Sequence, residues 1–292
     1  MISSTSVSLP NLAWKAGLSG YPGIESLTIF NETWAPYISW YSNYEPIAPN
    51  VETSDHTIIG APMLWGKGDQ CLSGTDGPVD AERLSNFTVY VAAGETAPSI
   101  FFGFYEPDCD CDSSSHIPSV PDGIDAWNTY LAPLRSSNSI PLGSPSMCTQ
   151  LDQKWLTEFN QTSSSHSVPE WDVTSIHVNK PTSAEGIAVV EYYYQTFGKP
   201  VWITELTCVD DSDWSSCGDQ NAVNSFIDGM VDFLEETDYV YAYGANNGEG
   251  VPGVWNLMES SSSGKTLTAT GEYYLEKLQS LKSSSSSSSY GK

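Results

Sequence analysis

Short apolar runs alternate with helix-period runs along most of the chain. Eight of the short runs are rich in β-branched and aromatic residues and are bounded by Gly, Pro or Asn, a pattern typical of buried strands. They cover Leu12–Leu18, Tyr37–Tyr41, Thr57–Trp65, Ser99–Tyr105, Ile140–Ser144, Val173–Val178, Val201–Leu206 and Tyr239–Tyr243. The pattern therefore predicts eight strands.

Several intervals between these runs repeat apolar residues every three or four positions, which predicts amphipathic helices. The clearest lie within Trp127–Leu134, Leu151–Phe159, Ile187–Phe197, Val223–Phe233 and Tyr274–Leu281. Thr182 and Glu185 follow Pro181 with the spacing of a capping box, which predicts the start of the third helix.

Strands that alternate with helices favour a parallel sheet with helices outside it. Eight such units at a spacing of about 30 residues close more naturally into a (β/α)8 TIM barrel than into an open sheet. A doubly wound open sheet is the alternative, although no Gly-rich phosphate loop follows the first strand.

The domain organisation follows from where the periodic pattern begins and ends. We expect an N-terminal extension over residues 1–9, one domain over 10–282 and a Ser-rich linker or tail over 283–292. Met1 is followed by no basic and apolar leader segment, so we expect any signal peptide to have been removed and Met1 to be an engineered start.

Charge and hydropathy exclude two classes of partner. The 36 acidic and 11 basic residues give a formal charge of -25, which would repel the phosphates of a nucleic acid. No apolar run approaches the roughly 20 residues that a membrane-spanning helix needs. We expect a monomer with a neutral ligand and no metal or organic cofactor.

Cysteines and glycosylation acceptors favour a secreted protein, extracellular or associated with a cell wall. The six cysteines are Cys71, Cys109, Cys111, Cys148, Cys208 and Cys217, and we expect three disulfides that staple loops at the carboxyl ends of the strands. Cys208 and Cys217 form the most local pair, and the other pairings stay open. A metal site is the weaker reading, because no Cys-x-x-Cys pair is present. Acceptor sequons occur at Asn31, Asn86 and Asn160.

Two glutamates follow apolar runs at the end of a barrel where active sites form. Glu106 comes after the fourth run, and Glu205 is the next-to-last residue of the seventh. Two facing carboxylates are the minimum machinery of glycoside hydrolysis, and a separation of about 5–5.5 Å predicts retention. The charge of one raises the pKa of the other, so that one stays protonated as the acid.

Aromatic residues gather at the same strand ends. Sugar rings stack on aromatic faces, so we interpret these residues as a substrate platform, with core packing as the alternative. His177 is either a structural histidine or a hydrogen-bond partner of the nucleophile or of a sugar hydroxyl. The candidate substrate-binding residues are Trp40, Tyr41, Tyr44, Trp65, Tyr105, His177, Tyr243 and Trp255.

Short motifs in the same order carry a family resemblance. They are WYSNYEP at 40–46, APMLWG at 61–66, GFYEPD at 103–108, GSP at 143–145, SIH at 175–177, WITE at 202–205, NLM at 256–258 and LTATG at 267–271. Together they resemble glycoside hydrolase family 128, the alkali-sensitive-linkage glycosyl hydrolases. The resemblance implies a (β/α)8 barrel, often fungal, that cleaves β-1,3-glucan with retention, with Glu106 as acid/base and Glu205 as nucleophile.

The chain departs from the family pattern at three places. Tyr105 stands where members carry an Asn whose amide binds the sugar 2-hydroxyl, and a phenol offers one donor where an amide offers two. The family's His-Trp-Tyr reads His177-Val178-Asn179, and its Trp-Phe pair reads Tyr243-Gly244. These changes leave both carboxylates in place but reduce the number of aromatic residues available to stack on a sugar.

Two functions of different classes follow. The first is a secreted retaining endo-β-1,3-glucanase with an acidic pH optimum, set by deprotonation of Glu106 on its alkaline side. The second is a catalytically weak or inactive barrel that binds β-glucan as a lectin-like module. Hydrolysis of another β-glycan is a further alternative. Tyr105 discriminates, because a phenol filling the 2-hydroxyl subsite favours binding without turnover.

Overall fold

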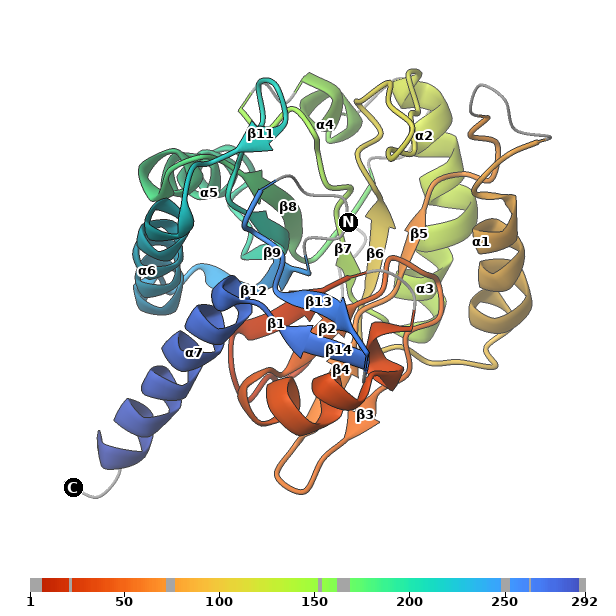
Figure 1. The fold of residues 1–292 in the computed structure, drawn as a ribbon. Helices are drawn as coiled ribbons and strands as arrows, with labels where there is room; N and C mark the ends of the chain where they lie inside the picture. The colour runs from red at the N-terminus through yellow and green to blue at the C-terminus, as the bar shows by residue number, and fades with distance from the viewer. Residues whose placement is uncertain are drawn as a thin grey trace.

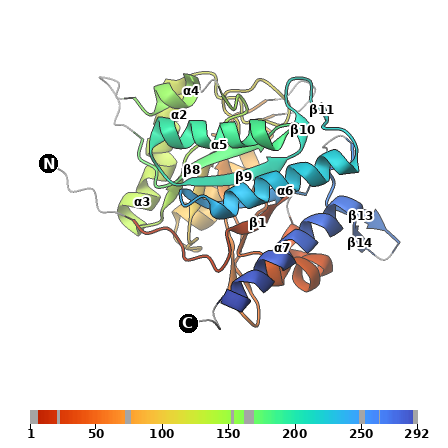
Figure 2. The same ribbon diagram turned by 90° about the vertical axis from the view of Figure 1, so that its left-hand side faces the viewer.

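Parallel strands form the centre of the molecule, and helices cover their outer side (Figures 1 and 2). The computed structural model describes residues 7–20, 23–71, 77–151, 154–161, 169–247, 253–262 and 264–288. Within these ranges no helix is both long and apolar enough to cross a bilayer.

Hydrogen bonds arrange the central strands in two sheets. One has the order β3-β4-β2-β1-β12-β9-β8 and the other β5-β6-β7, and only β3 with β4 pairs antiparallel among them. A parallel bridge from Gly143 to Val173 joins the second sheet to the residue before β8. The strands are β1 Ala16–Ser19, β2 Trp40–Ser42, β3 Val51–Glu52, β4 Thr57–Gly60, β5 Met63–Trp65, β6 Phe101–Phe104, β7 Leu142–Gly143, β8 Thr174–Asn179, β9 Val201–Thr207 and β12 Val240–Asn246.

Each of the eight predicted runs overlaps a strand, so the α/β architecture is confirmed. The third run divides into β4 and β5 because Pro62 has no N–H to donate, and its carbonyl instead accepts from Phe102 at 2.8 Å. Closure of the two sheets into one continuous barrel stays a prediction.

The predicted helices also form. Thr182 accepts from the backbone N–H of Glu185, which confirms the predicted start of α5, and the Glu185 carboxylate accepts from the Thr182 hydroxyl at 2.7 Å and not from its backbone N–H as in a full capping box. Asp219 caps α6 by accepting from two backbone N–H groups. The helices are α1 Ala81–Asn86, α2 Val120–Ala126, α3 Ala132–Asn138, α4 Lys154–Phe159, α5 Ser183–Phe197, α6 Gln220–Glu236 and α7 Ala269–Ser288, with single-turn or π-type segments at Ile24–Ser26, Phe30–Trp34, Ala35–Tyr37, Phe87–Ala92 and Trp127–Leu131.

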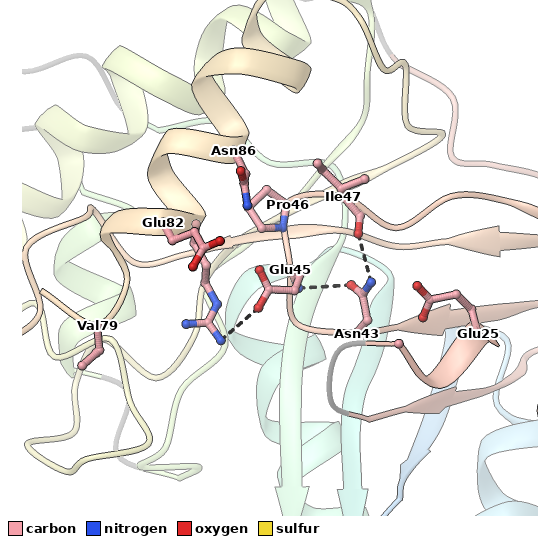
Figure 3. Close-up of a pocket in the computed structure, with 10 residues that line it drawn as sticks. Glu25, Asn43, Glu45, Pro46, Ile47, Val79, Glu82 and Asn86 are labelled. Atoms are coloured by element: carbon pink, nitrogen blue, oxygen red, sulfur yellow. Dashed lines mark hydrogen bonds and ion pairs between the residues drawn. The ribbon is translucent and has the colours of Figure 1, made fainter. Parts of the chain in front are cut away.

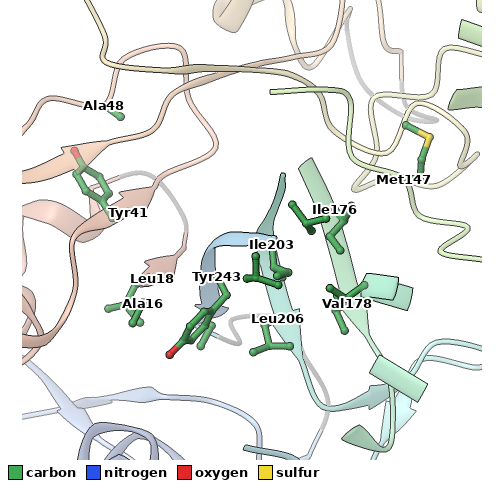
Figure 4. Close-up of a cluster of buried hydrophobic side chains, with 14 of the residues drawn as sticks. Ala16, Leu18, Tyr41, Ala48, Met147, Ile176, Val178, Ile203, Leu206 and Tyr243 are labelled. Carbon is green, nitrogen blue, oxygen red and sulfur yellow. The ribbon is translucent and has the colours of Figure 1, made fainter. Parts of the chain in front are cut away.

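Two buried clusters fill the space on either side of the strands. The larger packs strand residues such as Leu18, Ile176 and Ile203 with apolar helix faces (Figure 4). The smaller is rich in aromatic residues and includes Trp40 and Trp202, whose rings meet edge to face at 5.0 Å. Burial of these large side chains supplies most of the driving force that holds the strands together.

Disulfides form between Cys109 and Cys148 and between Cys208 and Cys217, which confirms the predicted local pair. Both pairs lie in loops that follow strands, as expected. Cys71 and Cys111 are exposed and not bonded, so the predicted third disulfide is not formed. Spacing along the chain could not decide this, because a disulfide requires two Cα atoms to lie within about 7 Å in the folded loops.

The C-terminal helix extends further than its apolar repeat. α7 runs to Ser288, past the predicted boundary at residue 282, while residues 289–292 and 1–6 lie outside the described residues. Among the glycosylation acceptors, Asn31 and Asn160 are exposed and Asn86 is half-buried at the end of α1. Their modification stays a prediction.

Candidate active site

Two strand ends bring the predicted carboxylates together. Glu205 lies on β9 and is 3% exposed, and Glu106 follows β6 and is 8% exposed. One oxygen of each carboxylate and one ring nitrogen of His177 lie within 4.8 Å of one another. The carboxyl ends of parallel strands meet at one edge of the sheet, which is why acids separated by 99 positions converge.

Three donors hold the Glu205 carboxylate. Its Oε2 accepts from the phenols of Tyr44 at 3.0 Å and Tyr105 at 2.9 Å, and its Oε1 accepts from the Asn179 amide at 3.1 Å. Hydrogen bonds to an ionised carboxylate are stronger than neutral ones. Glu205 is therefore held in one orientation, and three of the hydrogen-bonding positions of its carboxylate are occupied by protein donors.

Glu106 is paired with His177. The Nδ1 atom of His177 lies 2.8 Å from Glu106 Oε1. Burial raises the pKa of Glu106, aided by the nearby charge of Glu205 and opposed by His177. Burial lowers the pKa of His177, but the charge of Glu205 and the hydrogen bond to Glu106 outweigh it and raise the pKa overall. The pair therefore keeps a proton to higher pH than the isolated groups would.

Tyr105 occupies the centre of the aromatic group. Its ring lies 4.8 Å from that of His177, 5.4 Å from that of Tyr44 and 6.2 Å from that of Trp65, with which it is nearly parallel. Burial and the charge of Glu205 raise the pKa of the Tyr105 phenol well above its ordinary value. The phenol consequently stays protonated and directs its only donor at Glu205.

Three residues around the site have left-handed backbones. The φ angles are 59° at Tyr44, 71° at Trp65 and 49° at Glu106, each at or just after the end of a strand. A non-glycine residue in this region costs of order 1–3 kcal/mol, and such strain is concentrated at functional sites. The strained turns hold these side chains at the site, where glycine would provide the same backbone more cheaply but no functional group.

Comparisons with known proteins agree with this geometry. Residues 20–274 match the family model described as the glycosyl hydrolase catalytic core. A family 128 (subgroup VII) oligosaccharide-binding protein from Trichoderma gamsii is 32% identical, with a TM-score of 0.75, over 94% of this chain and 98% of that one. One from Cryptococcus neoformans is 34% identical, with a TM-score of 0.73, over 95% and 99%. This chain belongs to glycoside hydrolase family 128.

A curated relative extends the comparison. Alkali-sensitive linkage protein 1 of Schizosaccharomyces pombe is 25% identical over 273 residues, which are 91% of this family 128 chain. The match covers only 45% of that relative, so the chain spans less than half of its length.

Only half of the predicted substrate-binding residues of this family 128 chain lie around Glu106 and Glu205. Tyr44, Trp65, Tyr105 and His177 surround the two acids, as the contacts above describe. Four other candidates are at most 1% exposed and belong to the core: Trp40, Tyr41, Tyr243 and Trp255.

Each of these four side chains has its polar atom bound inside the protein. Trp40 donates to the carbonyl of Lys15, and Tyr41 to that of Pro49. Tyr243 donates to the Glu235 carboxylate, and Trp255 to the carbonyl of Asn246. The sequence alone did not reveal this, because successive strand residues point to opposite sides, so register decides the side for Trp40, Tyr41 and Tyr243, and the path of a loop decides it for Trp255.

Two residues at the site were missed as site residues. Asn179 binds Glu205, and Asn246 donates to the Tyr44 phenol at 3.0 Å. Asn179 belongs to the segment His177-Val178-Asn179, where the chain departs from the family's His-Trp-Tyr. That departure was a signal that could have marked Asn179 as a site residue. Asn246 ends β12, and its position at the end of the last strand was the available signal.

A cavity of about 530 Å³ is lined mainly by the loop after β2 and by α1 (Figure 3). Its lining includes Glu45, Glu82 and Arg83 but neither Glu106 nor Glu205. Arg83 forms an ion pair with Glu45 at 3.2 Å, and its guanidinium covers the Trp65 ring at 4.7 Å. Arg83 thus links this cavity to the site and supports Trp65 by a cation–π contact.

Glu106, His177 and Glu205 also form the one grouping, within the described ranges, with the composition of a metal site. Several of their ligand atoms already have protein partners: His177 Nδ1 binds Glu106, and Glu205 accepts three hydrogen bonds. The buried His177 Nε2 has no hydrogen-bond partner among the described residues. This arrangement matches acid–base chemistry, in which the groups exchange protons with one another or with a sugar oxygen.

The raised pKa values predict how stability varies with pH. The folded pKa of Glu106 exceeds 4.5 and that of His177 exceeds 6.5, so above these values the folded chain binds more protons than the unfolded one. The free energy of unfolding therefore falls as pH rises through this range. In Glu106→Gln the free energy of unfolding should fall less steeply with pH than in the wild type. Urea unfolding at several pH values measures this slope.

The exposed Glu82 on α1 provides the matched control. Glu82→Gln should keep the wild-type slope of unfolding free energy against pH. Like Glu106→Gln it removes one carboxylate, but it leaves the buried Glu106–His177 pair intact. Equal slopes for wild type and Glu106→Gln would contradict the assignment of the raised pKa to Glu106.

Proposed function

We propose that this chain binds β-1,3-gluco-oligosaccharides at the Glu106–Glu205 site and hydrolyses them slowly or not at all. The observation that carries the proposal is the hydrogen bond from the Tyr105 phenol to Glu205 at 2.9 Å. Two family 128 relatives above 30% identity are described as oligosaccharide-binding proteins, which supports the same reading.

Tyr105 weakens catalysis in two ways. Its donor is bound to Glu205, so it offers no second donor to a sugar 2-hydroxyl, whose hydrogen bonds supply several kcal/mol in the transition state. Together with Tyr44 and Asn179 it also stabilises the Glu205 anion, and a stabilised carboxylate is a poorer nucleophile. Tyr44 and Tyr105 are only partly buried and offer aromatic surface to a sugar, whereas Trp65 is 6% exposed and lies under Arg83.

Retaining hydrolysis is the second candidate, and the carboxylate geometry favours it. Oxygens of Glu106 and Glu205 lie within 4.8 Å, close to the roughly 5–5.5 Å separation of retaining enzymes. The raised pKa of Glu106 suits an acid that protonates the leaving oxygen. In this mechanism Glu205 attacks the anomeric carbon and Glu106, after giving its proton to the leaving group, activates water.

One experiment separates the two functions. Wild type and Glu205→Gln are incubated with laminarihexaose, and binding is measured by calorimetry beside the release of reducing ends. The proposal expects binding by both proteins and little or no product from either. Rapid product from the wild type alone would establish hydrolysis, and absence of binding by both would contradict each candidate.

The setting of the protein is part of the proposal. We infer a secreted monomer that works outside the cell or at a cell wall, supported by two disulfides and by exposed acceptors at Asn31 and Asn160. We also infer that the parallel part of the larger sheet, from β4 to β8, and the sheet of β5, β6 and β7 together complete one (β/α)8 barrel. The Gly143–Val173 bridge between the two sheets supports this.

A further inference from the structure

An exposed tryptophan stands on a disulfide-closed hairpin directly after β9. The hairpin pairs β10 (Val209–Asp210) with β11 (Ser215–Ser216), and Trp214 is 45% exposed in the turn between them. Within the described residues no hydrogen bond or ring contact involves its side chain. A tryptophan usually buries most of its surface, so this exposure requires an explanation.

The backbone of Trp214 makes a merely structural role unfavourable. Its φ angle is 58°, in the left-handed region where glycine is preferred. A large side chain in that conformation costs free energy, and nearly half of this one stays in solvent. The position therefore retains an indole at the expense of local stability, which points to a role for the exposed ring.

The hairpin is attached to the loops that carry the candidate site. The Cys208–Cys217 disulfide closes its base next to β9, which bears Glu205. The Lys180 ammonium forms an ion pair with Asp211 of the hairpin, and Lys180 follows Asn179, the amide donor to Glu205. Figure 2 shows β10 and β11 next to the ends of the strands β8 and β9.

A second contact places the hairpin beside the loop after β12. A Cβ added to Gly253 would lie 2.1 Å from the Ser216 hydroxyl, so these two segments touch. The same loop carries Val254, which is exposed. Trp214 thus stands among loops that all follow strands at the edge of the sheet where Glu106 and Glu205 meet.

We propose that Trp214 is a stacking platform for a glucosyl residue of a longer β-glucan chain, remote from the two acids. The inference rests on the proposed function and extends its binding site along the loops that follow the strands. Stacking of an apolar sugar face on indole needs only one exposed ring, and the surrounding Asp210, Asp213 and Ser215 offer groups for hydroxyls.

A protein partner fits this surface less well. A stable protein interface buries about 1,000 Å² or more, whereas Trp214 is flanked by carboxylates and hydroxyls and not by a continuous apolar patch. A second copy of a chain with a formal charge of -25 would also be repelled. A neutral glucan meets neither obstacle.

The test compares short and long sugars. Affinities for laminaribiose and laminarihexaose are measured by calorimetry for wild type, Trp214→Gly, Trp214→Phe and the control Tyr90→Ala, which removes another exposed aromatic ring. Trp214→Gly should weaken laminarihexaose binding about tenfold and leave laminaribiose unchanged, since one stacked ring contributes about that factor. Trp214→Phe should restore part of the affinity, and Tyr90→Ala should behave as wild type.

Stability separates a binding role from a structural one. Because glycine accepts a φ of 58° without strain, Trp214→Gly should unfold at the same temperature as wild type or a higher one. Unchanged hexaose binding in Trp214→Gly, or an equal loss for both sugars, would overturn the platform while leaving the proposed function standing. A change from dimer to monomer in this variant would favour a second copy instead. Failure of the wild type to bind either sugar would overturn both.

Discussion

Replacing Tyr105 with Asn should raise the rate of laminarihexaose hydrolysis by about a hundredfold or more over the wild type. The substitution removes one of the three donors to Glu205, which restores part of its nucleophilicity. It also frees room beside His177 and Trp65 and supplies an amide for the sugar 2-hydroxyl. Those hydrogen bonds are worth several kcal/mol in the transition state, and about 1.4 kcal/mol corresponds to tenfold in rate. Release of reducing ends over time measures the effect.

Two variants identify the cause of the gain. Tyr105→Phe removes the hydrogen bond to Glu205 but keeps the ring, so a smaller gain is expected because the sugar still lacks its amide partner. Adding Glu205→Gln to Tyr105→Asn should abolish product, since the nucleophile is gone. A wild type already as fast as Tyr105→Asn would contradict the binding function, and binding without product in Tyr105→Asn would mean that another feature prevents turnover.

Truncating Trp40 to Ala should lower the free energy of unfolding by about 3–5 kcal/mol, the usual cost of removing a large buried aromatic side chain. The Trp40 ring is fully buried, meets Trp202 at 5.0 Å and covers two glycines. Added Cβ atoms on Gly17 and Gly244 would lie only 2.4 Å and 2.8 Å from this ring. The strands that carry these glycines, β1 and β12, therefore cannot fill the cavity left by Trp40→Ala without moving their backbones. Urea unfolding monitored by fluorescence measures the loss.

Sugar binding distinguishes this core role from a substrate platform. Trp40→Phe keeps most of the buried area and should retain wild-type affinity for laminarihexaose with a smaller loss of stability. The surface variant Tyr90→Ala should change the free energy of unfolding by no more than about 0.5 kcal/mol. If a stable Trp40→Phe protein lost sugar binding, Trp40 would be a substrate-binding residue and not only a core residue.

The two acids could be located in advance because each follows an apolar run, and parallel strands present their carboxyl ends at one edge. The role of Tyr105 could be anticipated only as a departure from the family pattern. The Tyr105 phenol donates to Glu205 together with the Tyr44 phenol and the Asn179 amide, and this depends on residues at the ends of three different strands. Trp214 was not singled out, because exposure is a property of the folded hairpin and leaves no periodic signal.

Local order along the chain determined the alternation of strands and helices, the helix start at Thr182 and the placement of Glu106 and Glu205 near strand ends. These features depend on residues a few positions apart, whose side-chain period and backbone preferences are readable directly. Only the tertiary structure decided that Trp40, Tyr41, Tyr243 and Trp255 are core residues, and that Cys71 and Cys111 stay unpaired. Those outcomes depend on strand register and loop paths that join residues far apart in the chain, and no local pattern encodes either.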